Sequence, residues 1–81
     1  PYSKSDEIIL SLAKELFREL SSIVIGLETY ESWDGSNLRI LVTDDSSEVI
    51  DKILEIVYRV VEKHDAYGKI IPEIVKTDEN A

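Results

Sequence analysis

The chain has 81 residues, enough for one domain with a single core, and it contains no cysteine, which excludes disulfides and thiolate metal sites. No apolar run approaches the roughly 20 residues that cross a bilayer. We therefore expect a cytoplasmic protein and not a membrane protein. The formal net charge of -8, with basic residues scattered along the chain, opposes binding to nucleic acid.

The first half of the chain predicts one helix followed by two strands. Ser5 is the expected N-cap, and the apolar residues after it recur at the spacing of one helical face, which predicts a helix over 5–21. The β-branched runs on either side of "DGSN" predict strands near 22–27 and 38–43.

The second half predicts a long helix and a final strand. Asp45 and Glu48 form the expected capping box of a helix over 46–64, which Gly68 is expected to end in a left-handed conformation. The apolar residues of this helix cover more of its circumference than one sheet face requires, so a second surface should cover the rest. The last strand, "KIIPEIVK", contains Pro72 and is therefore expected at a sheet edge or a bulge.

Together these elements predict an α+β fold in the order αββαβ, with two helices packed on one small mixed sheet. One domain should extend over 1–76, and the polar residues 77–81 should form a flexible tail. The abundance of Ile, Val, Glu and Lys also leans toward the composition of thermophile proteins.

The order of elements resembles the minimal nucleotidyltransferase domain of the polymerase-β superfamily over nearly the whole chain. In that family a Gly-Ser turn holds the nucleotide phosphates, and the carboxylates of a following Asp-x-Asp motif hold magnesium ions. In this sequence Gly26 matches the glycine, Leu27 occupies the serine position, and Asn37 and Arg39 occupy the two aspartate positions.

This departure from the motif predicts an inactive domain without a cofactor. Metal-assisted nucleotidyl transfer needs anionic oxygen ligands for Mg²⁺, whereas the amide of Asn37 is neutral and the guanidinium of Arg39 repels a cation. The resemblance further implies a helical HEPN-domain protein as one partner, because minimal nucleotidyltransferases can act as antitoxins of such proteins.

Two other interpretations of the same residues stay open. In an unrelated αββαβ domain, Asp34 and Gly35 would form the turn of a β-hairpin, and Gly26 would mark a bulge or be an incidental glycine. In an active transferase or metal-dependent binding protein, carboxylates from the turn and the strands would converge on a cation or nucleotide. The carboxylates available for such a site are Asp34, Asp44, Asp45 and Glu73.

The remaining polar candidates favour structural roles. The adjacent pair Asp44 and Asp45 is typical of a helix start, and His64, the only histidine, lies where a cation suits the end of a helix dipole.

Aromatic side chains point instead to protein contact. Such residues dominate the energetics of interfaces, although Trp33 is also suited to packing back over the sheet. The aromatic residues considered for an interface are Tyr30, Trp33, Tyr58 and Tyr67. The sequence therefore predicts a non-enzymatic domain that acts through protein-protein contact, as a homodimer or with another protein.

Overall fold

The computed structural model describes residues 4–32, 35 and 37–77. The predicted α+β class and the αββαβ order are confirmed. The first and the last strand begin later than expected, and Ser5 lies inside the first helix and is not its N-cap as predicted. The elements are α1 (Lys4–Leu20), β1 (Val24–Thr29), β2 (Leu38–Val42), α2 (Ser47–Lys63) and β3 (Pro72–Lys76).

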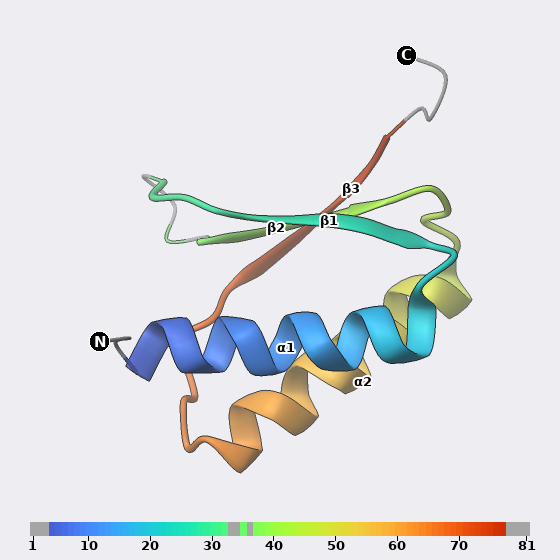
Figure 1. Cartoon of the computed structure of the whole chain (residues 1–81). Coiled ribbons are helices and arrows are strands. Elements are labelled where there is room, and N and C mark those ends of the chain that lie inside the picture. Colours follow the sequence, from blue (N-terminus) through green and yellow to red (C-terminus); the bar gives the residue numbers. More distant parts are fainter. Residues whose placement is uncertain (1–3, 33–34, 36, 78–81) are drawn as a thin grey trace.

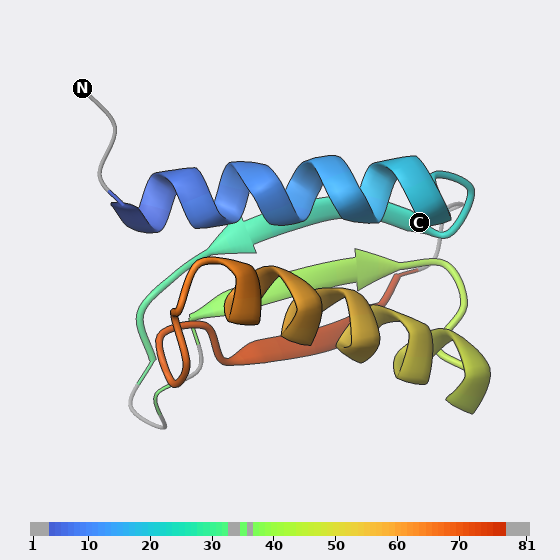
Figure 2. The same ribbon diagram turned by 90° about the horizontal axis from the view of Figure 1, so that it is seen from below.

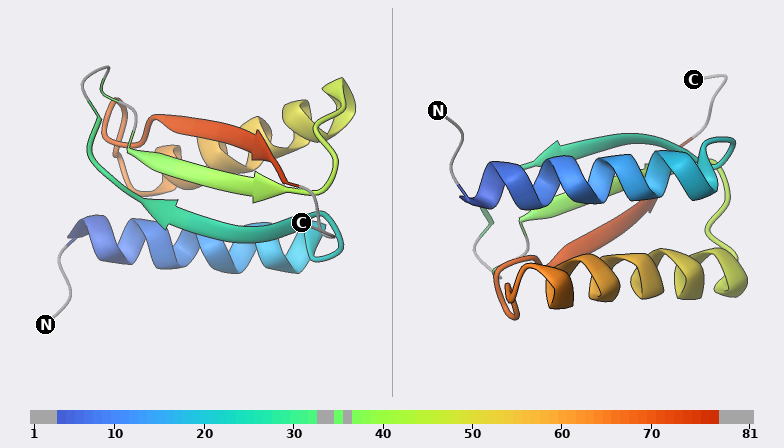
Figure 3. Two further views of the ribbon diagram at one scale, coloured as in Figure 1. Left: turned by 90° about the horizontal axis from the view of Figure 1, so that it is seen from above. Right: turned by 60° about the horizontal axis from the view of Figure 1, so that its bottom comes forward.

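The molecule has two layers, with both helices on one face of a three-stranded sheet (Figure 1). The central strand β2 pairs antiparallel with β1 and parallel with β3. Seen from the helical side, α1 lies along β1 and α2 lies along β2 and β3 (Figure 2 and the right view of Figure 3). Among the described elements no helix covers the opposite face of the sheet, here called the outer face. Neither described helix combines the length and the apolarity needed to cross a membrane.

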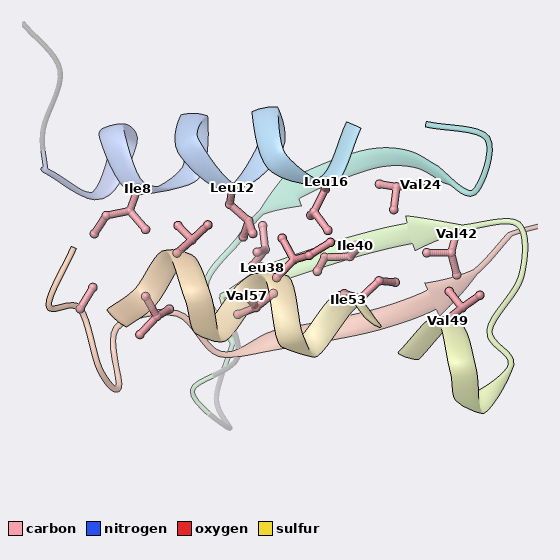
Figure 4. Packing of buried hydrophobic residues seen from close by; sticks show 14 residues of the cluster. Ile8, Leu12, Leu16, Val24, Leu38, Ile40, Val42, Val49, Ile53 and Val57 are labelled. Atoms are coloured by element: carbon pink, nitrogen blue, oxygen red, sulfur yellow. The ribbon is translucent and has the colours of Figure 1, made fainter. Parts of the chain in front are cut away.

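One aliphatic core lies between the two layers (Figure 4). Helix α1 buries residues four apart and β2 buries alternate residues, which are the spacings that place side chains on one face of a helix and of a strand. No polar or charged side chain of the described ranges is buried, so apolar packing holds the two layers together. The side chains with at most 1 % exposure that these two elements contribute are Ile8, Leu12, Leu16, Leu38, Ile40 and Val42.

The start of α2 differs from the predicted capping box. Ser46 is the N-cap residue and its side chain makes no cap hydrogen bond, whereas the carboxylate of Asp44 accepts the N–H of Ser46 at 2.8 Å. Because the helix begins one residue later than predicted, Glu48 is its second residue and Asp45 precedes the cap. The capping-box prediction was therefore wrong, and Asp44 makes the local turn that leads into the helix.

The end of α2 is a Schellman motif at Asp65, and the prediction that Gly68 ends the helix was wrong. The N–H of Ala66 donates to the carbonyl of Val61 at 2.9 Å, and the N–H of Asp65 donates to the carbonyl of Glu62 at 3.1 Å. Asp65 has a φ of +50°, so an aspartate occupies the left-handed position usually taken by glycine. Gly68, with a φ of +77°, bends the connection that follows.

Strand β3 lies at a sheet edge, as Pro72 predicted. The carbonyl of Ile71 accepts the N–H of Asn37, and the N–H of Thr77 donates to the carbonyl of Val42 at 2.8 Å. Successive residues of a strand direct their backbone polar groups to opposite sides. Because Ile71 and Thr77 direct theirs toward β2, Pro72 directs its own away from β2. The missing N–H of proline therefore falls on the free edge, where no ladder bond is lost. Thr77, which the sequence placed in the tail, still pairs with the sheet, and the rest of that tail lies outside the described residues.

Candidate functional site

The glycine matched to the transferase motif lies inside a strand and not at a turn. Gly26 pairs with Leu41, Leu27 pairs with Ile40, and the register shifts between Val24 and Gly26. The shift is a bulge or irregularity of the strand next to Gly26, and a bulge is one of the two roles that the hairpin interpretation allowed for this glycine. A Cβ atom on Gly26 would lie 3.2 Å from Cδ1 of Leu41, so the missing side chain leaves room for this neighbour on the outer face. The backbone at Gly26 therefore belongs to the sheet ladder and does not form a phosphate-binding turn.

Asn37, at the first aspartate position, joins three segments of the chain. Its side-chain oxygen accepts the N–H of Ile71 at 2.9 Å, and its side-chain nitrogen donates to the carbonyl of Lys69. Its backbone carbonyl accepts the N–H of Tyr30 at 3.1 Å, which closes the pairing of β1 with β2. The residues between Tyr30 and Asn37 form the 31–36 loop, and the predicted turn residue Asp34 lies outside the described residues. Both the oxygen and the nitrogen of the Asn37 side-chain amide thus form hydrogen bonds within the fold.

Arg39, at the second aspartate position, takes part in a polar cluster on the outer face. Its guanidinium carbon lies 4.4 Å from the centre of the Tyr30 ring, and its Nη1 lies 3.7 Å from Oε2 of Glu28. The hydroxyl of Tyr30 donates to Oε2 of Glu73 at 2.7 Å. Four side chains from three strands or their ends are therefore linked by a cation–π contact, an ion pair and a hydrogen bond.

Of the predicted carboxylates, Asp34 lies outside the described residues, and the structure places Glu73 apart from Asp44. Glu73 is the register partner of Arg39, whereas Asp44 comes five residues further along from Arg39, at the other end of the sheet. At about 3.3 Å per strand residue, the two backbones are separated by roughly 16 Å. Within the described ranges no group of three or more His, Asp or Glu side chains could hold a metal ion.

His64 follows the last residue of α2, as its C-cap, and its backbone N–H donates to the carbonyl of Val60 at 3.1 Å. Its Nε2 atom is buried and has no hydrogen-bond partner in the part of the chain that the structure describes. Its place at the end of α2 is the one that the sequence predicted.

A group of charged side chains joins the exposed sides of α1 and α2. Glu19 accepts a hydrogen bond from Arg59 and lies 3.4 Å from Nζ of Lys52, and Arg18 bonds to Glu15 one turn earlier. Partial burial raises the pKa of Glu19, but the hydrogen bonds and charges of Arg59, and then those of Lys52, outweigh this effect and lower the pKa below its ordinary value. Carboxylates and cations thus alternate across this helix interface.

The two remaining aromatic candidates lie together in an apolar groove between α2 and β3. Tyr58 and Tyr67 are 67 % and 62 % exposed, although both line the same cavity of 260 Å³. Tyr67 comes from the loop after α2, and Tyr58 comes from α2 itself. The residues that define this α2–β3 groove are Leu54, Tyr58, Val61, Tyr67, Ile71 and Pro72.

The sequence indicated part of this groove but could not assemble it. The wide apolar surface of α2 predicted that a second surface would be needed, and α1 covers some of it. Leu54, Tyr58 and Val61 follow at spacings of four and three residues, which is the signal that places them on one helical strip. Ile71, 42 % exposed, was missed because its position depends on how the loop after α2 returns to the sheet.

The other aromatic candidates do not join the groove. Tyr30 packs under Arg39 on the outer face of the sheet, and Trp33 lies outside the described residues. Of the predicted interaction residues that the structure describes, Tyr58 and Tyr67 therefore lie in the groove and Tyr30 lies on the outer face of the sheet.

Comparisons with known proteins found no matching family model, no matching curated protein and no matching solved structure. The resemblance to nucleotidyltransferases accordingly rests on the order of elements and on the motif positions alone.

Proposed function

We propose that this chain is a catalytically inactive, nucleotidyltransferase-like domain that acts by binding another protein in the α2–β3 groove. The observation that carries the proposal is the pair Tyr58 and Tyr67, one on α2 and one in the loop after it, which line one apolar cavity while exposing most of their surface.

Exposed tyrosines beside aliphatic side chains form an energetically favourable anchor site. Burial of a large ring releases more ordered water than burial of a small side chain, and the tyrosine hydroxyl can keep a hydrogen bond at the rim. Tyrosine is also enriched among the residues that contribute most of the binding energy at interfaces. The neighbouring Leu54 and Ile71 provide the apolar floor that such an anchor needs.

The contacts of the two motif residues support the absence of catalysis. The Asn37 amide is occupied by Lys69 and Ile71, and under the resemblance the cation of Arg39 replaces an anionic metal ligand. The family resemblance suggests a HEPN-domain protein as one class of partner and an antitoxin-like or regulatory role.

Site-specific photocrosslinking in the native host tests the interaction. Benzoylphenylalanine replaces Tyr58 in one variant and the exposed Lys14 on α1 in a control. We expect a crosslinked protein at position 58 and none at position 14. The same adduct at both positions, or no adduct at position 58, would argue against a groove-mediated interaction.

Calorimetric titration with ATP and GTP in the presence of Mg²⁺ tests the lack of catalytic competence. We expect no saturable heat for either nucleotide. Saturable, Mg²⁺-dependent binding would show that acidic residues near the 31–36 loop form a working site, and the non-catalytic proposal would have to be abandoned.

A further inference from the structure

An acidic ridge borders the α2–β3 groove along α2. Asp51, Glu55 and Glu62 stand seven and three residues before Tyr58 and four residues after it, so they occupy the same helical strip. All three side chains are exposed. Any segment that fills the groove therefore meets a line of carboxylates at its α2 rim.

The charges on this ridge are largely uncompensated. Asp51 and Glu62 make no ion pair with any basic side chain in the described ranges, and Glu55 has only the 3.9 Å approach of Lys52. The cations of α2 lie on its other side, where Arg59 and Lys52 face Glu19 of α1. The groove side of α2 is consequently negative and its α1 side is close to balanced.

This charge pattern disfavours a second copy of the chain as the occupant. Each copy carries a formal net charge of -8, and docking groove against groove would bring two acidic ridges together. Like charges placed opposite one another across an interface oppose association. The complementary occupant carries apolar side chains for the groove and basic side chains for the ridge.

The backbone at the groove favours an occupant that binds through side chains. Pro72 has no N–H, and both polar backbone groups of Ile71 are already bonded to Asn37. An extended segment added to this end of β3 would therefore lack donors for a ladder. An amphipathic helix needs no backbone partner, because its own hydrogen bonds are internal.

We propose that the α2–β3 groove binds an amphipathic helix with a basic flank, supplied by a protein of different sequence. The inference rests on the proposed function and specifies the chemistry of its partner. The apolar face of the helix would cover Tyr58, Tyr67 and Ile71, and its Lys or Arg residues would pair with Asp51 and Glu62.

A synthetic probe tests this inference with the full chain. The probe is a leucine–lysine peptide of about 15 residues, near the shortest length that forms a helix in water. One comparison peptide replaces each lysine by glutamate, and another has the same composition in an order that destroys the apolar face. Fluorescence anisotropy of labelled peptides measures the affinity of each.

We expect the amphipathic basic probe to bind about tenfold or more tightly than either comparison peptide, which corresponds to about 1.4 kcal/mol. Equal binding of the acidic peptide would overturn the role of the ridge. Equal binding of the scrambled peptide would reduce the effect to non-specific attraction between charges and would overturn the proposal as well.

Matched variants locate the probe on the protein. Tyr58→Ala should weaken binding about tenfold, because it removes the anchor ring. The double variant Asp51→Asn with Glu62→Gln should weaken it about threefold to tenfold, since exposed charge pairs contribute modestly. A control with the same charge change away from the groove, Glu7→Gln with Glu31→Gln, should bind like the native chain.

The outcomes separate this inference from the proposed function. A partner crosslinked at position 58 that contacts the groove with an acidic or extended segment would refute the basic helix and retain the interaction domain. A crosslinked second copy of the chain would refute the different-sequence partner. Loss of probe binding in the Glu7 and Glu31 control alone would place the site elsewhere on the molecule.

Discussion

At the scale of single residues, Asn37 is the clearest case of a motif position that serves the fold. We expect Asn37→Ala to lower the free energy of unfolding by about 1–2 kcal/mol, because two side-chain hydrogen bonds at the start of β3 are lost. Urea unfolding followed by far-UV circular dichroism measures the change.

A matched variant shows whether the amide or a carboxylate suits this position. Asn37→Asp keeps an acceptor for the N–H of Ile71 but places a negative oxygen against the carbonyl of Lys69. We expect it to be less stable than the native chain and not to be rescued by Mg²⁺. A stability gain on adding Mg²⁺ would mean that this edge of the sheet can assemble a metal site after a single substitution.

At the scale of elements, the end of α2 depends on a residue that is poorly suited to its conformation. Asp65 holds a φ of +50°, where a side chain is strained and glycine is not. We expect Asp65→Gly to raise the free energy of unfolding by about 0.5–1 kcal/mol. The reason is that the relief of backbone strain should exceed the cost of the entropy that glycine adds to the unfolded chain. Thermal unfolding measures this change in stability. Gly68→Ala is the control with the opposite expected sign, because it places a side chain at a positive φ. A destabilised Asp65→Gly variant would mean that the aspartate side chain holds the helix end.

The ion pairs between α1 and α2 predict a pH dependence with a definite sign. Because the folded-state pKa of Glu19 is lowered, its contribution to stability is complete above the unfolded value of about 4.3 and is lost as the pH falls through the folded value. We expect Glu19→Gln to be less stable than the native chain at pH 7 and to differ less from it at pH 3. Urea unfolding at both pH values measures this, with the exposed Glu31→Gln as control. A stability difference independent of pH would assign the effect of Glu19 to packing.

The elements were predictable where one spacing decides the structure. The burial of Ile8, Leu12 and Leu16 on α1 follows from their four-residue spacing, and Pro72 at the edge strand follows from its missing N–H. These patterns act over a few residues and do not depend on the rest of the chain. They gave both helices and the αββαβ order.

The candidate site was less predictable because it depends on contacts between distant segments. The bonds of Asn37 to Lys69 and Ile71 span more than 30 residues, and nothing local indicates them. The end of α2 at Asp65, and not at Gly68, accompanies the packing of Ala66 into the core, where it is 0 % exposed. Tyr58 and Tyr67 were identified as interaction residues, but their meeting in one groove required the path of the loop between them.

For the whole molecule, the net charge governs whether the exposed groove leads to self-association. At pH 7 and low salt, repulsion between chains of formal charge -8 should keep the protein monomeric at its mass of 9.2 kDa. Raising the salt from about 0.05 M to about 0.5 M shortens the Debye length from about 14 Å to about 4 Å, so the repulsion is screened and the apolar contact is not.

Light scattering coupled to size-exclusion chromatography should therefore show weak association that grows with salt. Tyr58→Ala should associate less at every salt concentration, because the contact that salt reveals is the α2–β3 groove. Tyr67→Ala should behave in the same way, whereas Phe17→Ala, which removes an exposed ring from α1, should resemble the native chain. A dimer already present at low salt would mean that the groove accepts a second copy despite the charge, and the occupant would then have to be the chain itself.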